Sequence, residues 1–195
     1  MRVILIRHGQ TEWNLLQKYQ GQTDIPLTDL GRSQAQKAGE YLANNENIEV
    51  LYCSDLSRTR ETAEIVGRSI GLSPTCDARL RELSFGEWEG LTFNQVYEKY
   101  PEEFNNWYND AFKINVPGGE SFDQLIKRAM EAVKEIMAKH KGTIAIVTHG
   151  GVIKAILSQS EAKSDIWQTG VDPGSITILD IANEKFIPIE IGLKP

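Results

Sequence analysis

The sequence has few of the features that cross-link a chain or anchor it in a membrane. Among its 195 residues are two cysteines, Cys53 and Cys76, and they form no Cys-x-x-Cys pair. Two isolated cysteines do not make a disulfide framework, so we expect a reducing compartment, the cytoplasm. No apolar run approaches the roughly 18 residues of a membrane span. The opening residues, "MRVILIRHG", are interrupted too early for a signal peptide.

Positive charge is also in short supply. The chain has 21 lysines and arginines against 27 aspartates and glutamates, which gives a net charge of −6. An acidic surface repels nucleic acid and anionic membranes, so we expect neither as a partner. An anionic substrate must therefore be attracted by a local cluster of arginines, because the overall field of the protein opposes its approach.

The apolar residues that are present predict an α/β fold, which we expect to form one domain over residues 1–195. Continuous apolar runs, typical of strands buried on both faces of a parallel sheet, lie at 3–6, 48–53 and 143–148. Helical patterns lie between and after them at 28–44, 55–70, 121–140 and 151–159. Late strands are expected at 175–181 and 185–191. Pro188 favours a sheet edge for the last strand, since proline cannot donate a backbone hydrogen bond.

Two helical segments carry little that suggests chemistry. Residues 121–140 begin with Ser121 and Gln124, a capping-box pattern, and we expect their charged side chains to lie on a solvated face. Residues 91–112 are rich in aromatic side chains, and we expect short helices broken at Pro101 that form a cap-like segment. For these aromatic residues a place in the core is favoured over a specific ligand site.

Two predicted strands end in the same dipeptide, His-Gly. His8 follows the run at 3–6, and His149, with Gly150 after it, follows the run at 143–148. In an open α/β sheet, ligands bind beyond the carboxyl ends of the strands. Both histidines would therefore reach the same crevice if their strands are neighbours, and the glycines would let the backbone turn sharply beside a ligand.

Two arginines and a glutamate are expected at the same edge of the sheet. Arg7 stands beside His8, and Arg58 lies in the first turn of the helix that follows the strand at 48–53. Arginine forks suit a dianion such as phosphate, and a histidine between them can act as a nucleophile or a proton donor. An alcohol leaving group also needs a proton. In "LRELSFGEWEG", residues 80–90, Glu82 is the general acid that we expect.

Other interpretations of these residues stay open. A single histidine is more often structural than catalytic, and an arginine beside a strand is usually a solvated charge. His8 and His149 could bind zinc together with Cys53 or Asp55, although two arginines would repel the cation. A binding module without catalysis is a third alternative, because a fold does not fix a function.

The motifs resemble those of a known family. "LIRHGQTEWN", residues 5–14, resembles the signature of the histidine phosphatase superfamily, the phosphoglycerate-mutase-like enzymes. Further blocks follow in the family's order: "GQTDIPLTDLGRSQA", "CSDLSRTRETAEI", "LRELSFGEWEGLT", "PGGESFDQLIKRA" and "IVTHGGVIKAIL". The resemblance covers nearly the whole chain. It implies a phosphoglycerate mutase-like fold, a three-layer α/β/α sandwich with a mainly parallel central sheet, and chemistry that needs no metal or other cofactor.

The resemblance also implies a role for each site residue. His8 would attack phosphorus and become a phosphohistidine, and Glu82 would protonate the leaving oxygen and then take a proton from water. The groups that would surround the phosphoryl oxygens are Arg7, Arg58 and His149. Residues at positions that line the phosphate pocket in the family, or follow its second histidine, are Asn14, Gln20, Gly21 and Gly150.

The family contains mutases and phosphatases, and this chain departs from the mutases. The mutases carry an asparagine and a lysine after the acid block and a paired-arginine segment. Here the block continues as "EGLTFNQ", and no Arg-Arg pair occurs anywhere. We therefore predict a phosphomonoesterase acting on a small phosphorylated metabolite, with the cofactor-dependent phosphoglycerate mutase as the alternative. The later segments resemble α-ribazole-5'-phosphate phosphatases and metal-independent phosphoserine phosphatases. A homodimer is the assembly that we consider.

Overall fold

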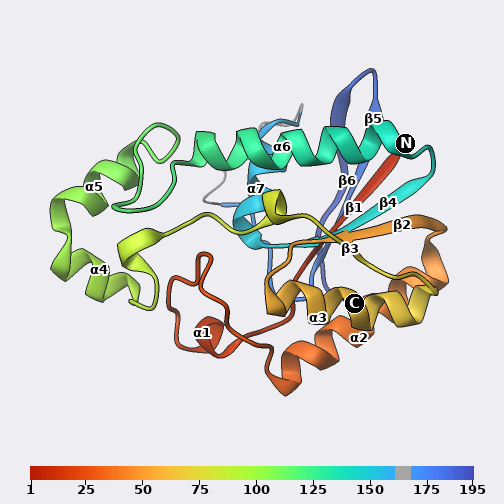
Figure 1. Ribbon diagram of the computed structural model, residues 1–195, viewed down its shortest axis with the longest axis horizontal. Helices are drawn as coiled ribbons and strands as arrows, with labels where there is room; N and C mark the ends of the chain where they lie inside the picture. Colours follow the sequence, from red (N-terminus) through yellow and green to blue (C-terminus); the bar gives the residue numbers. More distant parts are fainter. Residues whose placement is uncertain (161–167) are drawn as a thin grey trace.

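The computed structural model describes residues 1–160 and 168–195, and its centre is one six-stranded sheet (Figure 1). Across the sheet the strands are β3 (Thr75–Cys76), β2 (Ile48–Cys53), β4 (Thr143–Thr148), β1 (Arg2–Arg7), β5 (Ile176–Ala182) and β6 (Lys185–Leu193). The pairs β3–β2, β2–β4 and β4–β1 are parallel, whereas β5 runs antiparallel to β1 and to β6. The sheet is therefore mainly parallel, as predicted, and the strand that carries Pro188 lies at its edge.

Alternate residues of the central strands enter two separate cores. Val3 and Leu5 of β1 are buried against one helical layer, which includes α6 (Phe122–Lys139) and α7 (Gly150–Ser158). Ile4 and Ile6 are buried against the other layer, which includes α2 (Asp29–Asn45) and α3 (Ser57–Ile70). Figure 1 shows α6 on one side of the sheet and α2 and α3 on the other. Because both faces are covered, the strands are apolar without alternation, and the predicted three-layer sandwich is confirmed.

Two of the long helices, α2 and α6, begin after a residue whose side chain caps the helix, whereas α3 does not. Thr28 caps α2, and Ser121 forms the expected capping box with Gln124 at the start of α6. The helix predicted at 55–70 begins two residues later, as α3 at Ser57. Its N-cap residue, Leu56, offers no side-chain hydrogen bond. The nearby serine, Ser54, is engaged elsewhere, with one of the histidines described below.

The aromatic middle segment forms two short helices, α4 (Phe93–Lys99) and α5 (Pro101–Asn109), which break at the predicted proline. In Figure 1 they project to one side of the sheet. Trp107 is buried and packs on Trp88 with ring centroids 5.5 Å apart, whereas Phe93 stays half exposed. The expected core role therefore holds for part of the segment only. A cap over a substrate stays a prediction.

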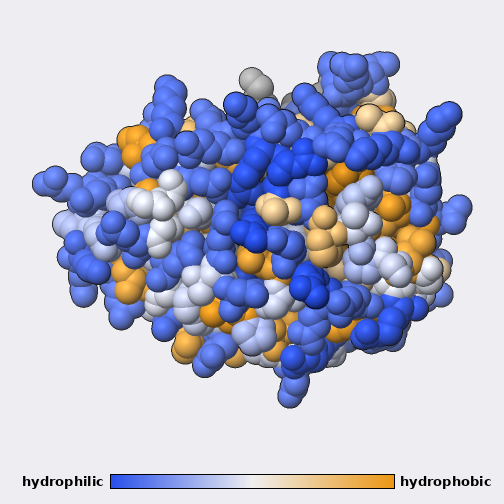
Figure 2. Space-filling view, viewed as in Figure 1, coloured by the Kyte–Doolittle hydropathy of each residue, from blue (hydrophilic) through white to orange (hydrophobic). Residues whose placement is uncertain are grey.

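Short elements connect the larger ones, and the sequence patterns did not predict them. These are the two-residue strand β3, the one-turn helix α1 (Glu12–Leu15) and the 3-10 turns η1 (Ala78–Leu80) and η2 (Gly86–Trp88). Figure 2 shows the same side of the molecule as Figure 1. That face is mostly hydrophilic, and its apolar residues form separate patches. Within the described parts of the chain, no helix has the length and apolar character that crossing a membrane requires.

Candidate active site

The two histidines leave neighbouring strands side by side. β1 and β4 are parallel, and Arg7 is paired with Thr148 in their register, so the next residue on each strand is a histidine. The backbone N–H of His8 donates to the Thr148 carbonyl at 3.0 Å. The rings of His8 and His149 are buried, with centroids 5.2 Å apart. The repeated His-Gly dipeptide thus places two imidazoles at one point of the carboxyl edge of the sheet.

His8 has the protonation pattern of a nucleophile. Its Nδ1 lies 2.7 Å from the Gly9 carbonyl oxygen, which can only accept, so Nδ1 carries the hydrogen and Nε2 keeps its lone pair. Burial, followed by the charges of Arg58 and Arg7, lowers the pKa of His8 well below its ordinary value. The ring is therefore neutral at neutral pH, and Nε2 is available for attack.

The two predicted arginines lie beside this ring, each held by backbone carbonyls. Arg58 is buried and donates through Nη1 to Thr23 O at 2.8 Å and through Nη2 to Gly21 O at 2.7 Å. Arg7 donates through Nη1 to Val171 O at 2.6 Å. Burial lowers the pKa of Arg58 to about 10, and the nearby Glu82 opposes that shift, so the guanidinium is charged at neutral pH. The site is locally cationic in an acidic protein.

Ser54, which the sequence analysis missed, orients the second histidine. His149 Nε2 lies 3.0 Å from Ser54 Oγ, and Ser54 follows β2 as the histidines follow β1 and β4. Its position directly after a strand, which it shares with the two histidines, is the sequence feature that could have identified Ser54 as a site residue. Burial, then the charges of Arg58 and the His8 ring, lowers the pKa of His149 well below its ordinary value. Three buried nitrogen atoms of this cluster lack a hydrogen-bond partner within the described residues: Arg7 Nε, Arg58 Nε and His149 Nδ1.

Glu82 lies at the same place, and the N-terminus of α7 fixes it. Its Oε2 accepts the Gly151 N–H at 3.1 Å, and its Oε1 accepts the Leu83 N–H at 2.8 Å. A Cβ on Gly151 would collide with Glu82 Oε1, so this close approach requires glycine.

Arg128 holds the segment that carries Glu82. From α6 it donates to the carbonyls of Arg79, Arg81 and Glu82 at 2.6–2.8 Å and to the Glu120 carboxylate at 2.8 Å. The expectation that the charges of 121–140 lie on a solvated face is wrong for this residue. The sequence could not reveal it, because its partners are backbone carbonyls that lie more than 40 residues away along the chain.

The remaining predicted residues line two adjoining cavities. Asn14, Gln20 and Gly21 share a cavity of about 170 Å³ with His8, Arg7, Arg58 and Glu82. The side-chain oxygens of Asn14 and Gln20 face the Thr11 hydroxyl at 3.0 and 2.8 Å, which leaves their amide N–H groups for an anion. Gly150 instead lines a neighbouring cavity of about 420 Å³ that also includes Arg7 and Glu82.

The walls of that neighbouring cavity differ from those of the phosphate-sized one. One wall is apolar and includes Phe85, Trp107 and Phe122. Polar contributions come from Lys154 and Asp172.

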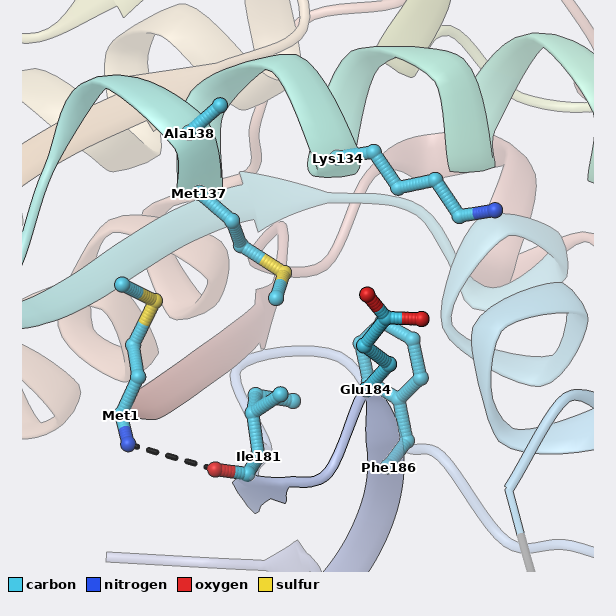
Figure 3. Close-up of a pocket in the computed structure, with 7 residues that line it drawn as sticks. All are labelled: Met1, Lys134, Met137, Ala138, Ile181, Glu184 and Phe186. Carbon is cyan, nitrogen blue, oxygen red and sulfur yellow. Dashed lines mark hydrogen bonds between the residues drawn. The ribbon is translucent and has the colours of Figure 1, made fainter.

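A larger cavity, about 550 Å³, lies elsewhere (Figure 3). It includes Met1, which precedes β1, whereas His8 follows β1, so it opens at the opposite edge of the sheet. Figure 3 shows Met137 and Phe186 around it, with the Lys134 ammonium and the Glu184 carboxylate as its charged groups. No histidine or arginine is among the residues that line it, so size does not identify the reactive site. In the described part of the chain, no three His, Cys, Asp or Glu residues are grouped to hold a metal ion.

Comparisons with known proteins agree with this geometry. The family model for "Histidine phosphatase superfamily (branch 1)" matches residues 3–192. A relative from Arabidopsis thaliana, named metal-independent phosphoserine phosphatase, is 32% identical over 191 residues, which cover 95% of this chain and 78% of the relative. The structure of Bacillus stearothermophilus YhfR superposes with a TM-score of 0.89 at 33% identity, over 98% of this chain and 96% of that one. The alpha-ribazole phosphatase from Shigella flexneri superposes with a TM-score of 0.87 at 27% identity, over 100% and 97%.

Proposed function

The chain belongs to the histidine phosphatase superfamily, branch 1, and on that premise we propose that it hydrolyses phosphate monoesters of small metabolites through His8. The observation that supports this most directly is the hydrogen bond from His8 Nδ1 to Gly9 O. It leaves the Nε2 lone pair facing a small cavity that also contains Arg7, Arg58 and Glu82. A nucleophile, two cations and a proton donor are the groups that transfer of a phosphoryl dianion requires.

In the first step, the lone pair of His8 Nε2 forms a bond to phosphorus while the bond from phosphorus to the alcohol oxygen breaks. The electron pair of the broken bond stays on that oxygen, which takes the proton of the Glu82 carboxyl group. The unpartnered N–H groups of Arg7 and Arg58 and the Nδ1 of His149 supply hydrogen bonds to the equatorial oxygens.

In the second step, the Glu82 carboxylate takes a proton from water as the water oxygen bonds to phosphorus. The bond from phosphorus to Nε2 breaks, and its electron pair returns to His8. Inorganic phosphate leaves, and Glu82 again holds the proton that the next ester needs. The sum is one ester and one water converted to one alcohol and one phosphate, with no net change in the protein.

The adjoining cavity of about 420 Å³ supports an alcohol with an apolar part. Phe85, Trp107 and Phe122 offer faces on which a planar or aliphatic group can pack. Of the two substrate types suggested by relatives, phosphoserine and α-ribazole phosphate, this wall favours the nucleoside-like ester. A panel of phosphoserine, glycerol phosphate, nucleoside monophosphates and aryl phosphates tests the choice. Equal kcat/KM across the panel would count against it.

The experiment for the function itself is phosphate release from p-nitrophenyl phosphate in the presence of a chelator. We expect wild-type activity and its loss in His8→Ala. The control is His140→Ala, a substitution of the third histidine, which contacts Tyr52 and Glu49 and lies outside the site. Acid-labile labelling of wild type, and not of His8→Ala, by a radioactive phosphate ester would identify the phosphohistidine. Activity that persists in His8→Ala would refute the proposed nucleophile.

A cytoplasmic location and a homodimer belong to the same proposal. The Sγ atoms of Cys53 and Cys76 are 3.6 Å apart as thiols, which is compatible with a reducing compartment. Light scattering on the purified protein measures the mass in solution, and a mass of one chain would exclude the dimer.

A further inference from the structure

Glu89, which follows η2, collects donors from two segments of the site. Its Oε1 accepts the backbone N–H groups of Gln22 at 3.0 Å and Phe85 at 3.1 Å. Its Oε2 accepts both the backbone N–H of Thr23, at 2.9 Å, and the Thr23 hydroxyl. Charge-assisted hydrogen bonds of this kind are about twice as strong as neutral ones, so the carboxylate holds the loop at residues 21–23 firmly.

The same loop holds Arg58 from its other side. The two hydrogen bonds that orient the Arg58 guanidinium end on the carbonyls of Gly21 and Thr23. Within the described residues, no hydrogen bond joins Glu89 to Arg58 directly. A Cβ on Gly21 would collide with the Glu89 carboxylate, and Gly21 has a φ of +53°. The carboxylate therefore packs directly against the peptide whose carbonyl aims the arginine.

Glu89 also connects this loop to the segment of the general acid. The Phe85 N–H that it accepts lies three residues after Glu82, and Gln22 Nε2 donates to the Glu82 carbonyl at 3.3 Å. One carboxylate thus fixes the separation between the residue that binds the phosphoryl group and the residue that protonates the leaving group. An error of about 1 Å in such a separation can cost about a hundredfold in rate.

We propose that Glu89 is a positioning residue for phosphoryl transfer, acting on Arg58 through the loop at residues 21–23. The inference rests on the proposed function, since the orientation of Arg58 affects the rate only if Arg58 binds the phosphoryl oxygens. Glu89 itself touches no reacting atom. A role in folding alone is the competing explanation, and the two differ in whether the effect of Glu89 depends on Arg58.

The first test compares Glu89→Gln with Glu87→Gln. Glutamine has the size of glutamate but places an N–H₂ group against backbone N–H donors, so the loop loses part of its support. For Glu89→Gln we expect kcat/KM with p-nitrophenyl phosphate to fall about tenfold or more, and inorganic phosphate to inhibit more weakly. Glu87 lies in the same turn but is exposed, and among the described residues its carboxylate accepts only the Tyr100 hydroxyl, at 2.9 Å. We expect Glu87→Gln to stay within a factor of about two.

The second test repeats Glu89→Gln in the Arg58→Ala background. If Glu89 acts through Arg58, the further loss should shrink to a factor of about two, because the residue that it positions is gone. The same tenfold loss in both backgrounds would overturn the proposal in favour of a general structural role. Should Glu89→Gln fail to fold, Thr23→Val, which removes one hydroxyl contact, takes its place in the same cycle.

A crystal structure of Glu89→Gln separates this inference from the proposed function. Displacement of Gly21 and Thr23, with loss of their bonds to Arg58, supports the positioning role even if the wild type turns over no ester. A variant in which both carbonyls still accept from Arg58 at unchanged distances overturns it. Absence of turnover in the wild type, with Arg58 in place, would instead count against the proposed function.

Discussion

At the scale of single residues, one hydrogen bond gives each of two similar histidines its own part. His8 commits Nδ1 to Gly9 O and so presents a bare Nε2. His149 commits Nε2 to Ser54 Oγ and leaves Nδ1 without a partner within the described chain. The ring nitrogen that carries the hydrogen bond to the protein therefore differs between the two histidines. The dipeptide repeat is a repeat of position and not of role.

The role of Glu82 is tested by the leaving group. An alkyl alcohol is a poor leaving group and depends on the proton of Glu82, whereas p-nitrophenolate leaves almost without help. We expect Glu82→Gln to lower kcat for an alkyl phosphate by about 10²–10⁴-fold and for the aryl ester far less. Steady-state kinetics on both esters measures the difference. Equal losses would remove Glu82 from the acid role, since a displaced loop would affect both esters alike.

At the scale of elements, Gly151, the second residue of α7, sets the position of Glu82. An alanine at position 151 would place a methyl group against Glu82 Oε1 and push the carboxylate out of line. We expect Gly151→Ala to lower kcat/KM by about a hundredfold, although alanine in a helix is normally more favourable than glycine by up to about 1 kcal/mol.

Thermal unfolding and kinetics, measured together, check this expectation. The control is Ser158→Ala at the other end of α7, where the hydroxyl donates only to the Ala155 carbonyl. A Gly151→Ala enzyme with wild-type kcat/KM would show that Glu82 tolerates displacement and would contradict the proposed geometry.

The helices and strands that have a long pattern of apolar residues could be predicted from the sequence, but the contacts between them could not. The predicted strands at 48–53 and 143–148 match β2 and β4 residue for residue. β4 is buried from Ile144 to Thr148, which favours an unbroken apolar run, whereas β2 is partly exposed, with Glu49 at the surface. β3 was missed because two exposed residues carry no pattern. Among the site residues that follow strands, His8 and His149 were found, whereas Ser54 was missed although it follows β2 in the same way. Arg128 and Glu89 were not assigned a role, because each binds backbone groups, and the residue types do not show which backbone groups lie nearby.

At the scale of the whole molecule, the two buried histidines link stability to pH. Burial and the nearby Arg58 lower the pKa of both His8 and His149 in the folded protein, so each is neutral there. In the unfolded chain each titrates near its ordinary value of about 6.5. Below that pH the unfolded state binds more protons than the folded state. The contribution of the histidines to stability is therefore complete above about pH 6.5 and is lost as the pH falls.

We expect the free energy of unfolding to drop below pH 6.5 by up to about 1.4 kcal/mol per pH unit for each of the two histidines. Asp55, Asp77 and Asp180 also have lowered pKa values, chiefly because of hydrogen bonds to arginines, but their contribution is lost only near and below their ordinary pKa of about 3.9. Glu49, Glu120 and Glu135 also have lowered pKa values, and their contribution is lost near and below their ordinary pKa of about 4.3, so the window between about pH 5.5 and 6.5 belongs to the histidines. Urea unfolding across this window measures the slope, which His8→Gln and His149→Gln should each reduce by about half. A slope that survives both site substitutions would mean that the acid sensitivity arises elsewhere, and that the folded protein holds these rings in a charged form unsuited to nucleophilic attack.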